Sequence, residues 1–140
     1  MYRRILVAYD GSQGAQGALK AGIELAKLHQ AQLWALAVEE KLPRFSATID
    51  EVKEEKEFAN EHYGKLLAAA REEGAQAGLE VKTVLRPGHA AQTILEVARE
   101  GRFDLIVVGH SGLSGVWAMF LGTTAEKVSR HAPCSVLIVR

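Results

Sequence analysis

Short runs of consecutive apolar residues limit this chain to a small set of folds. Residues 5–8, 33–38 and 105–108 are apolar throughout. Runs of this length without a polar face are typical of parallel strands that are buried on both sides. Between them, apolar residues recur every three or four positions, as they do on one face of a helix. The sequence therefore predicts strands that alternate with helices.

The other elements extend this alternation to five strands. Helical patterns cover residues 15–26, 50–77, 91–98 and 123–131, and the two further strands are residues 79–85 and 135–139. Apolar and polar residues alternate in 79–85, which predicts a strand at a sheet edge. We expect a turn at 86–88 and a loop at 39–49.

This order of elements predicts a three-layer α/β fold, an open sheet of five mainly parallel strands with helices on both faces. Residues 10–11 and Gly109 follow the first and fourth strands and are the most loop-like strand exits. Placing these two strands side by side gives the strand order 3-2-1-4-5. Ligands of such sheets bind beyond the carboxyl ends of the strands, where the strand order reverses.

Composition narrows the class of protein further. The length of 140 residues predicts one domain, residues 1–140, and 17 basic against 17 acidic residues give no net charge. We therefore expect neither a nucleic-acid partner nor a membrane partner. A single cysteine, Cys134, excludes an internal disulfide, and we expect neither a signal segment nor a membrane-spanning run. These features predict a soluble cytoplasmic protein.

The fourth predicted strand leads into the stretch that carries most of the functional signal. Gly109 ends the strand, Gly112 follows, and nine residues later Gly122 precedes two threonines and a helical pattern. Glycines let a backbone approach an anion closely, and a helix N-terminus favours negative charge. The pattern therefore predicts a phosphate site. The alternative is that the glycines only form turns and that Thr123 caps the helix, with Glu126 completing a capping box.

A second polar segment, Asp10-Gly11-Ser12, follows the first strand. In the predicted topology it faces the same cleft, where Asp10 can reach a ligand. The alternative is that Asp10 or Ser12 only caps the first helix. The surrounding glycines match neither the dinucleotide-binding fingerprint nor the P-loop.

Catalytic and metal-binding patterns fit the sequence poorly. Ser111 follows a strand and a glycine, but Leu113 replaces the last glycine of a nucleophile elbow. A phosphoacceptor role for Asp10 lacks an adjacent acidic residue and a lysine at the end of the last strand. The histidines are not spaced as metal ligands.

Taken together, the motifs closely resemble the ATP-binding branch of the universal stress protein family. The resemblance covers the whole chain: the nine-residue segment Arg4 to Ser12, the pattern Gly109-x2-Gly112-x9-Gly122-Thr123, and the segment 126–139. It implies a single universal stress protein domain of the adenine-nucleotide alpha-hydrolase-like type.

The resemblance also implies where the nucleoside part of an adenine nucleotide lies. Asp10 would face the adenine and ribose, with Ala8 beside the base. Val38 would meet the adenine edge through its main chain. Val108 and Gly109 would flank the ribose and the first phosphate.

The phosphates would be held by five residues of the glycine-rich stretch: Ser111, Gly112, Gly122, Thr123 and Thr124. The implied ligand is ATP, with Mg²⁺ bound through the phosphates. This chain departs from many family members because residues 113–121 carry no charge. Charge-assisted contacts are the strong ones, so the alternatives ADP and AMP stay open.

Family members commonly form homodimers by antiparallel pairing of the last strand, which here is Val136 to Val139. Left unpaired, this strand would be an exposed apolar edge. The resemblance favours a regulatory nucleotide-binding protein of the stress response. The alternatives are a slow ATPase or phosphotransferase, for which Asp10 and His110 are the available groups, and a nucleotide-free dimeric scaffold.

Overall fold

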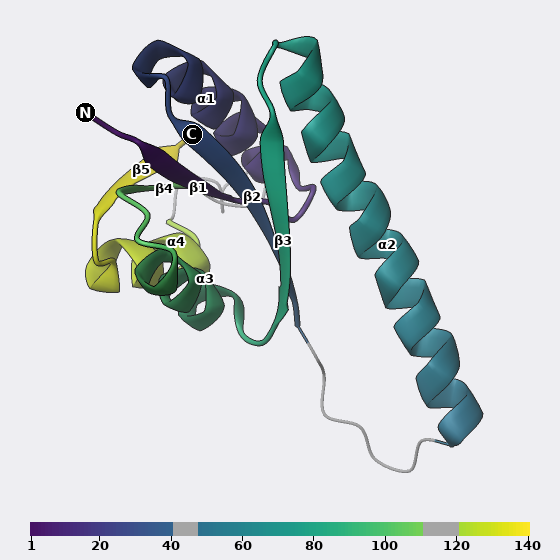
Figure 1. Cartoon of the computed structure of the whole chain (residues 1–140). Helices are drawn as coiled ribbons and strands as arrows, with labels where there is room; N and C mark the ends of the chain where they lie inside the picture. The colour runs from purple at the N-terminus through teal and green to yellow at the C-terminus, as the bar shows by residue number, and fades with distance from the viewer. Residues whose placement is uncertain (41–47, 111–120) are drawn as a thin grey trace.

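The computed structural model describes residues 1–40, 48–110 and 121–140. Its centre is a parallel sheet of five strands: β1 (Arg4–Ala8), β2 (Gln32–Glu39), β3 (Val81–Pro87), β4 (Leu105–Gly109) and β5 (Ser135–Val139). The strand order is β3-β2-β1-β4-β5, as the sequence predicts (Figure 1). β1 and β4 are therefore neighbours, and the loops after them start at the same edge of the sheet.

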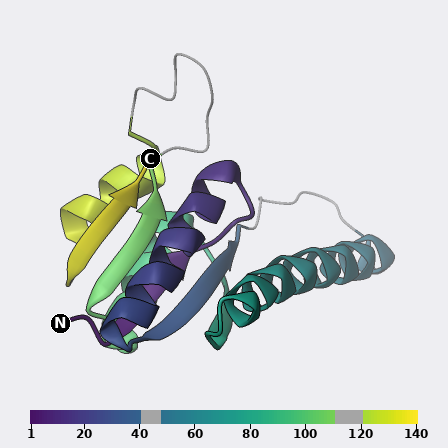
Figure 2. The same ribbon diagram turned by 90° about the horizontal axis from the view of Figure 1, so that it is seen from above.

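Four helices complete the three layers: α1 (Gln13–His29), α2 (Ile49–Gln76), α3 (Ala90–Glu100) and α4 (Thr123–His131). Figure 2 shows α1 and α2 on one side of the sheet and α3 and α4 on the other. The predicted α/β architecture is confirmed. None of the helices in the described ranges is long and apolar enough to span a membrane.

The apolar runs are explained by how β1 packs. Ile5 and Val7 belong to the core beneath α1 and α2, whereas Leu6 belongs to the core beneath α3 and α4, and all three are fully buried. Successive strand residues point to opposite faces, so a strand covered on both sides needs an apolar residue at every position. Each such side chain contributes roughly 1.5–3 kcal/mol on burial.

The predicted turn at residues 86–88 is confirmed only at Gly88 and is wrong for the two residues before it. Arg86 and Pro87 continue β3 and lie opposite Val38 and Glu39 of β2. A proline is compatible with this position because β3 is an edge strand, where a missing backbone N–H leaves no partner unpaired. The chain turns at Gly88, whose φ of 139° suits glycine.

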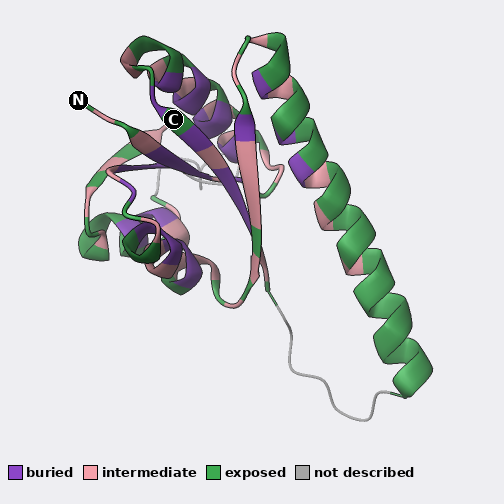
Figure 3. Cartoon of the chain, in the orientation of Figure 1, coloured by how far each residue is buried: buried purple, intermediate pink, exposed green. Residues whose placement is uncertain are grey.

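The helix α2 packs on the sheet through only part of its length. Its buried residues are Leu67, Ala70 and Gly74, all in the C-terminal half, and the N-terminal half is almost entirely exposed (Figure 3). This agrees with the charged face predicted from the sequence. A capping box of Thr48 and Glu51 begins the helix, and residues 41–47 of the predicted loop lie outside the described residues.

Candidate functional site

A cleft of about 640 Å³ lies at the C-terminal edge of the sheet. Residues at the ends of β1, β2 and β4 form its floor, and residues from the N-terminal parts of α1, α3 and α4 and from α2 form its walls. This volume is within the range of small-molecule sites, roughly 300–1,000 Å³. The position is the one expected for a ligand of a parallel sheet whose strand order reverses between β1 and β4.

The predicted site residues converge on this cleft. Of the ten, eight are described by the structure, and every one of them lines it: Ala8, Asp10, Val38, Val108, Gly109, Gly122, Thr123 and Thr124. The other two, Ser111 and Gly112, lie outside the described residues. Segments from four separate parts of the chain therefore meet at one place.

The turn from β1 to α1 is held by side-chain hydrogen bonds. Ser12 is the N-cap of α1, and its Oγ accepts the N–H of Ala15 at 3.2 Å. Asp10 Oδ1 accepts the N–H of Ser12 at 2.9 Å. The capping alternative thus holds for Ser12, while Asp10 fixes the turn and remains exposed to the cleft. Gly11, with φ of 80°, supplies the backbone conformation that the turn needs.

The two described glycines of the glycine-rich stretch differ in their surroundings. At Gly109, a Cβ atom would lie 2.7 Å from the carbonyl carbon of Gly14, so the end of β4 and the first turn of α1 touch backbone to backbone. Gly122 is partly buried, and its φ of −62° and ψ of 151° suit any residue. Gly109 therefore has a packing role, whereas the backbone conformation does not require glycine at 122.

The predicted capping box at Thr123 is wrong. Gly122, not Thr123, is the N-cap of α4, and Glu126 pairs instead with Arg130 at 2.9 Å. Within the described residues, no side chain caps the N-terminus of α4. Helix N-termini leave backbone N–H groups without intrahelical partners, so this end of α4 offers donors and a partial positive charge to an anion.

Residues 113–121 carry no charged side chain, but Arg140, at the end of the chain, places a cation near the cleft. The N–H of His110 donates to the carbonyl of Val139 at 2.7 Å, which extends the pairing of β4 with β5. The Arg140 guanidinium then lies 3.5 Å from His110 Nε2, and His110 lines the cleft. Sequence reasoning missed Arg140 because thirty residues separate it from His110 and only the strand pairing unites them.

The opposite wall of the cleft also contains residues that the sequence did not indicate. Tyr63 reaches it from α2, and Glu40 reaches it from the end of β2. Glu40 Oε1 accepts the N–H of Ala90 at the start of α3, at 3.2 Å. Burial raises the pKa of Tyr63, and Glu39, Glu40 and Asp10 raise it further, against a smaller lowering by a backbone hydrogen bond at Glu40. The phenol is therefore neutral at physiological pH.

The whole chain matches a known protein family. The family model described as "Universal stress protein family" matches residues 1–140. The chain belongs to the universal stress protein family. This confirms the resemblance seen in the sequence.

Relatives within the universal stress protein family match the chain over almost its full length. The Bacillus subtilis universal stress protein YxiE is 38% identical over 151 residues, which cover 100% of both proteins. The solved structure of universal stress protein UspA from Lactobacillus plantarum has a TM-score of 0.86 and 31% identity, and the match covers 99% of this chain and 98% of that one. A universal stress protein solved in complex with cAMP has a TM-score of 0.77 and 26% identity, with 99% and 97% covered.

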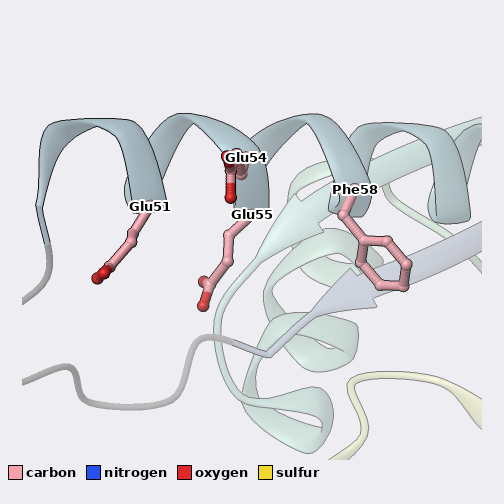
Figure 4. A pocket seen from close by; sticks show the side chains of 4 residues that line it. All are labelled: Glu51, Glu54, Glu55 and Phe58. Carbon is pink, nitrogen blue, oxygen red and sulfur yellow. The ribbon is translucent and has the colours of Figure 1, made fainter.

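A second hollow, of about 360 Å³, is a poor candidate for the site of this universal stress protein. Glu51, Glu54, Glu55 and Phe58 line it, all from the first turns of α2 (Figure 4). Carboxylates repel anionic ligands, and one helix alone encloses little. Across residues 1–40, 48–110 and 121–140, no group of three or more histidine, cysteine, aspartate or glutamate side chains is placed to bind a metal ion.

Proposed function

We propose that this universal stress protein binds ATP in the cleft and acts as a regulatory protein of the stress response, with residues 1–140 forming one domain. The observation that carries the proposal is the N-terminus of α4, which has no side-chain cap in the described part of the chain and faces the cleft through Thr123 and Thr124. The related protein solved with cAMP supports an adenine nucleotide as ligand.

The two ends of the cleft differ in chemistry, which orients the proposed ligand. Ala8, Val38 and Val108 provide apolar contacts for the base, and Asp10 provides a carboxylate for the nucleoside. These residues form the proposed nucleoside end.

The phosphates are proposed to bind at Gly109, Gly122, Thr123 and Thr124, together with Ser111 and Gly112. Arg140 lies beside this end, 3.5 Å from His110, and supplies positive charge. Mg²⁺ would bind through the phosphates rather than through a cluster of protein ligands. ADP and AMP share every contact except those of the terminal phosphates, so all three nucleotides belong in the test.

We propose binding rather than rapid hydrolysis. Hydrolysis needs a group that positions water beside the terminal phosphate. Asp10, Glu40 and His110 are the candidates among the described lining residues. Asp10 Oδ1 and Glu40 Oε1 already accept backbone N–H groups, and His110 contacts Arg140. Release of ADP on a timescale of seconds under saturating Mg²⁺ and ATP would favour the ATPase alternative.

Thermal unfolding tests the proposed function. A ligand that binds only the folded protein stabilises it by about 2.7 kcal/mol at a concentration one hundred times its dissociation constant. For a domain of this size we expect the melting temperature to rise by roughly 6–12 °C with saturating Mg²⁺ and ATP. Guanosine at the same concentration is the control. An unchanged melting temperature at millimolar ATP contradicts the proposal.

We also propose that the protein is a homodimer through β5. In the described part of the chain β5 pairs only with β4, and Leu137 on it is 36% exposed. Light scattering at micromolar concentration should give the mass of a dimer. Leu137→Lys should give a monomer because lysine on an edge strand opposes pairing. The control Leu28→Lys, at a 77% exposed position of α1, should remain a dimer. A monomeric unmodified protein contradicts this proposal.

A further inference from the structure

We propose that the ring of Tyr63 covers the base of the bound nucleotide and contributes to recognition of a purine. The inference rests on the proposed function and concerns one wall of the same cleft. It assigns a binding role to α2, a helix that none of the sequence motifs connects with the site.

The position of Tyr63 is fixed by the residues that follow it on α2. Leu67 and Ala70 are buried in the core with α1, at 7% and 0% exposure. Leu66 packs over Gly11, where a Cβ atom would lie 2.5 Å from Leu66 Cδ1. Residues three and four apart lie on the same side of a helix, so Tyr63 extends this packed face by one turn. The face leads directly from the core to the turn between β1 and α1.

Tyr63 combines an aromatic ring with access to the cleft. Of the described lining residues, the two tyrosines are Tyr9 and Tyr63. Tyr9 is only 6% exposed and belongs to the core, whereas Tyr63 is half-buried. Of these two tyrosines, Tyr63 is thus the one whose ring remains accessible to a ligand.

The surroundings of Tyr63 suit a flat, neutral, aromatic ligand group. Ala8, Val38 and Val108 line the same cleft with apolar surface, so a base can lie between them and the ring. The phenol is neutral, as shown above, and three carboxylates act on it: Glu39, Glu40 and Asp10. These charges disfavour a phosphate at this wall and favour the uncharged base. Stacking of a base on an aromatic side chain changes affinity by roughly five- to 150-fold.

The neighbouring aromatic residues on α2 provide a matched control. His62 contacts Tyr63 edge-on at 5.0 Å between ring centroids, and Phe58 stacks on His62 at 6.4 Å. Phe58 is 72% exposed and does not line the cleft. Phe58→Ala therefore removes an aromatic ring from the same helix without removing one from the proposed site.

The test is calorimetric titration of the unmodified protein and three variants with adenosine, AMP and ATP. We expect Tyr63→Leu to weaken all three ligands by the same factor, roughly tenfold, since the base is common to them. Tyr63→Phe keeps the ring, and Phe58→Ala leaves the site unchanged, so both should bind within twofold of the unmodified protein. Leucine retains apolar volume against α2, and a melting curve of each variant checks that it is folded.

Each outcome is decisive. An unmodified protein that binds ATP and a folded Tyr63→Leu variant that binds equally well overturn this inference alone. A loss that grows from adenosine to ATP also overturns it, because Tyr63 would then act on the phosphates. An unmodified protein that binds none of the three ligands overturns the proposed function and this inference with it.

Discussion

Gly122→Val is expected to abolish ATP binding and to leave the fold intact. The backbone of Gly122 has φ of −62° and ψ of 151°, an extended conformation that suits valine, and the residue is only partly buried. The stability should therefore change by less than about 1 kcal/mol. A branched side chain at this N-cap places atoms where a phosphate would approach the N–H groups of α4. We expect at least a hundredfold weaker binding, about 2.8 kcal/mol.

Gly122→Ser is the matched variant for this prediction. At the start of α1, the Ser12 hydroxyl accepts the N–H of Ala15, and a serine at 122 can do the same for α4. The serine cap should raise the free energy of unfolding by a few tenths of a kcal/mol and weaken ATP binding by less than valine does. If Gly122→Val is folded and binds ATP as the unmodified protein does, the phosphates do not lie at the N-terminus of α4.

Gly109→Ala is expected to lower the free energy of unfolding by about 3 kcal/mol, at the upper end for overpacking. The new Cβ would lie 2.7 Å and 2.8 Å from the carbonyl carbon and oxygen of Gly14. Backbone atoms cannot rotate away as a flexible side chain does, so the first turn of α1 must move away from β4. Urea unfolding measures the effect, and ATP binding should weaken as well because Gly14 and Ser12 line the cleft.

Gly17→Ala, on helix α1, which Gly109 contacts, is the control. A Cβ atom at Gly17 would lie 3.8 Å from Val139 Cγ1, which is an ordinary contact. Alanine is favoured over glycine inside a helix by roughly 0.5–1 kcal/mol, so this variant should be more stable than the unmodified protein. Equal stability of Gly109→Ala and the unmodified protein would show that β4 and α1 do not approach as closely as described.

Gly109 and Gly122 show how much of the site can be predicted from the sequence. The pattern that includes Gly109 and Gly122 is visible in the sequence and correctly indicates one cleft. It does not reveal that Gly109 is needed for contact with Gly14, because that contact depends on the packing of α1 against β4. Spacing alone assigns both glycines one role, and only the three-dimensional contacts separate them.

The fold itself was predictable because its signals are local. A strand such as β1, buried on both faces, needs an apolar residue at every position, and the loops after β1 and β4 restrict the order of strands. The errors arose where local patterns allow two outcomes. Thr123 with Glu126 has the spacing of a capping box, but helix α4 begins one residue earlier than that box requires. Pro87 suggests a turn, but β2 is long enough to pair with it.

Sequence reasoning missed Tyr63 and Arg140 for a different reason. Tyr63 belongs to a helix whose charged sequence indicates exposure, and Arg140 follows the last strand. Both positions depend on tertiary packing: Tyr63 lines the cleft through the packing of Leu66 over Gly11, and Arg140 contacts the lining residue His110 through the pairing of β4 with β5. Neither type of contact leaves a periodic signal in one sequence.

The most direct test of ATP binding is isothermal titration of the nucleotide-stripped protein with ATP, ADP and AMP, each with and without Mg²⁺. We expect saturable binding of all three, with ATP tightest in Mg²⁺ and AMP weakest, because the proposed binding mode places the phosphates near the N-terminus of α4 and Arg140. Each tenfold step in affinity corresponds to about 1.4 kcal/mol. No saturable heat with any of the three nucleotides, at protein and ligand concentrations that reach millimolar dissociation constants, would contradict the proposal that this cleft binds ATP.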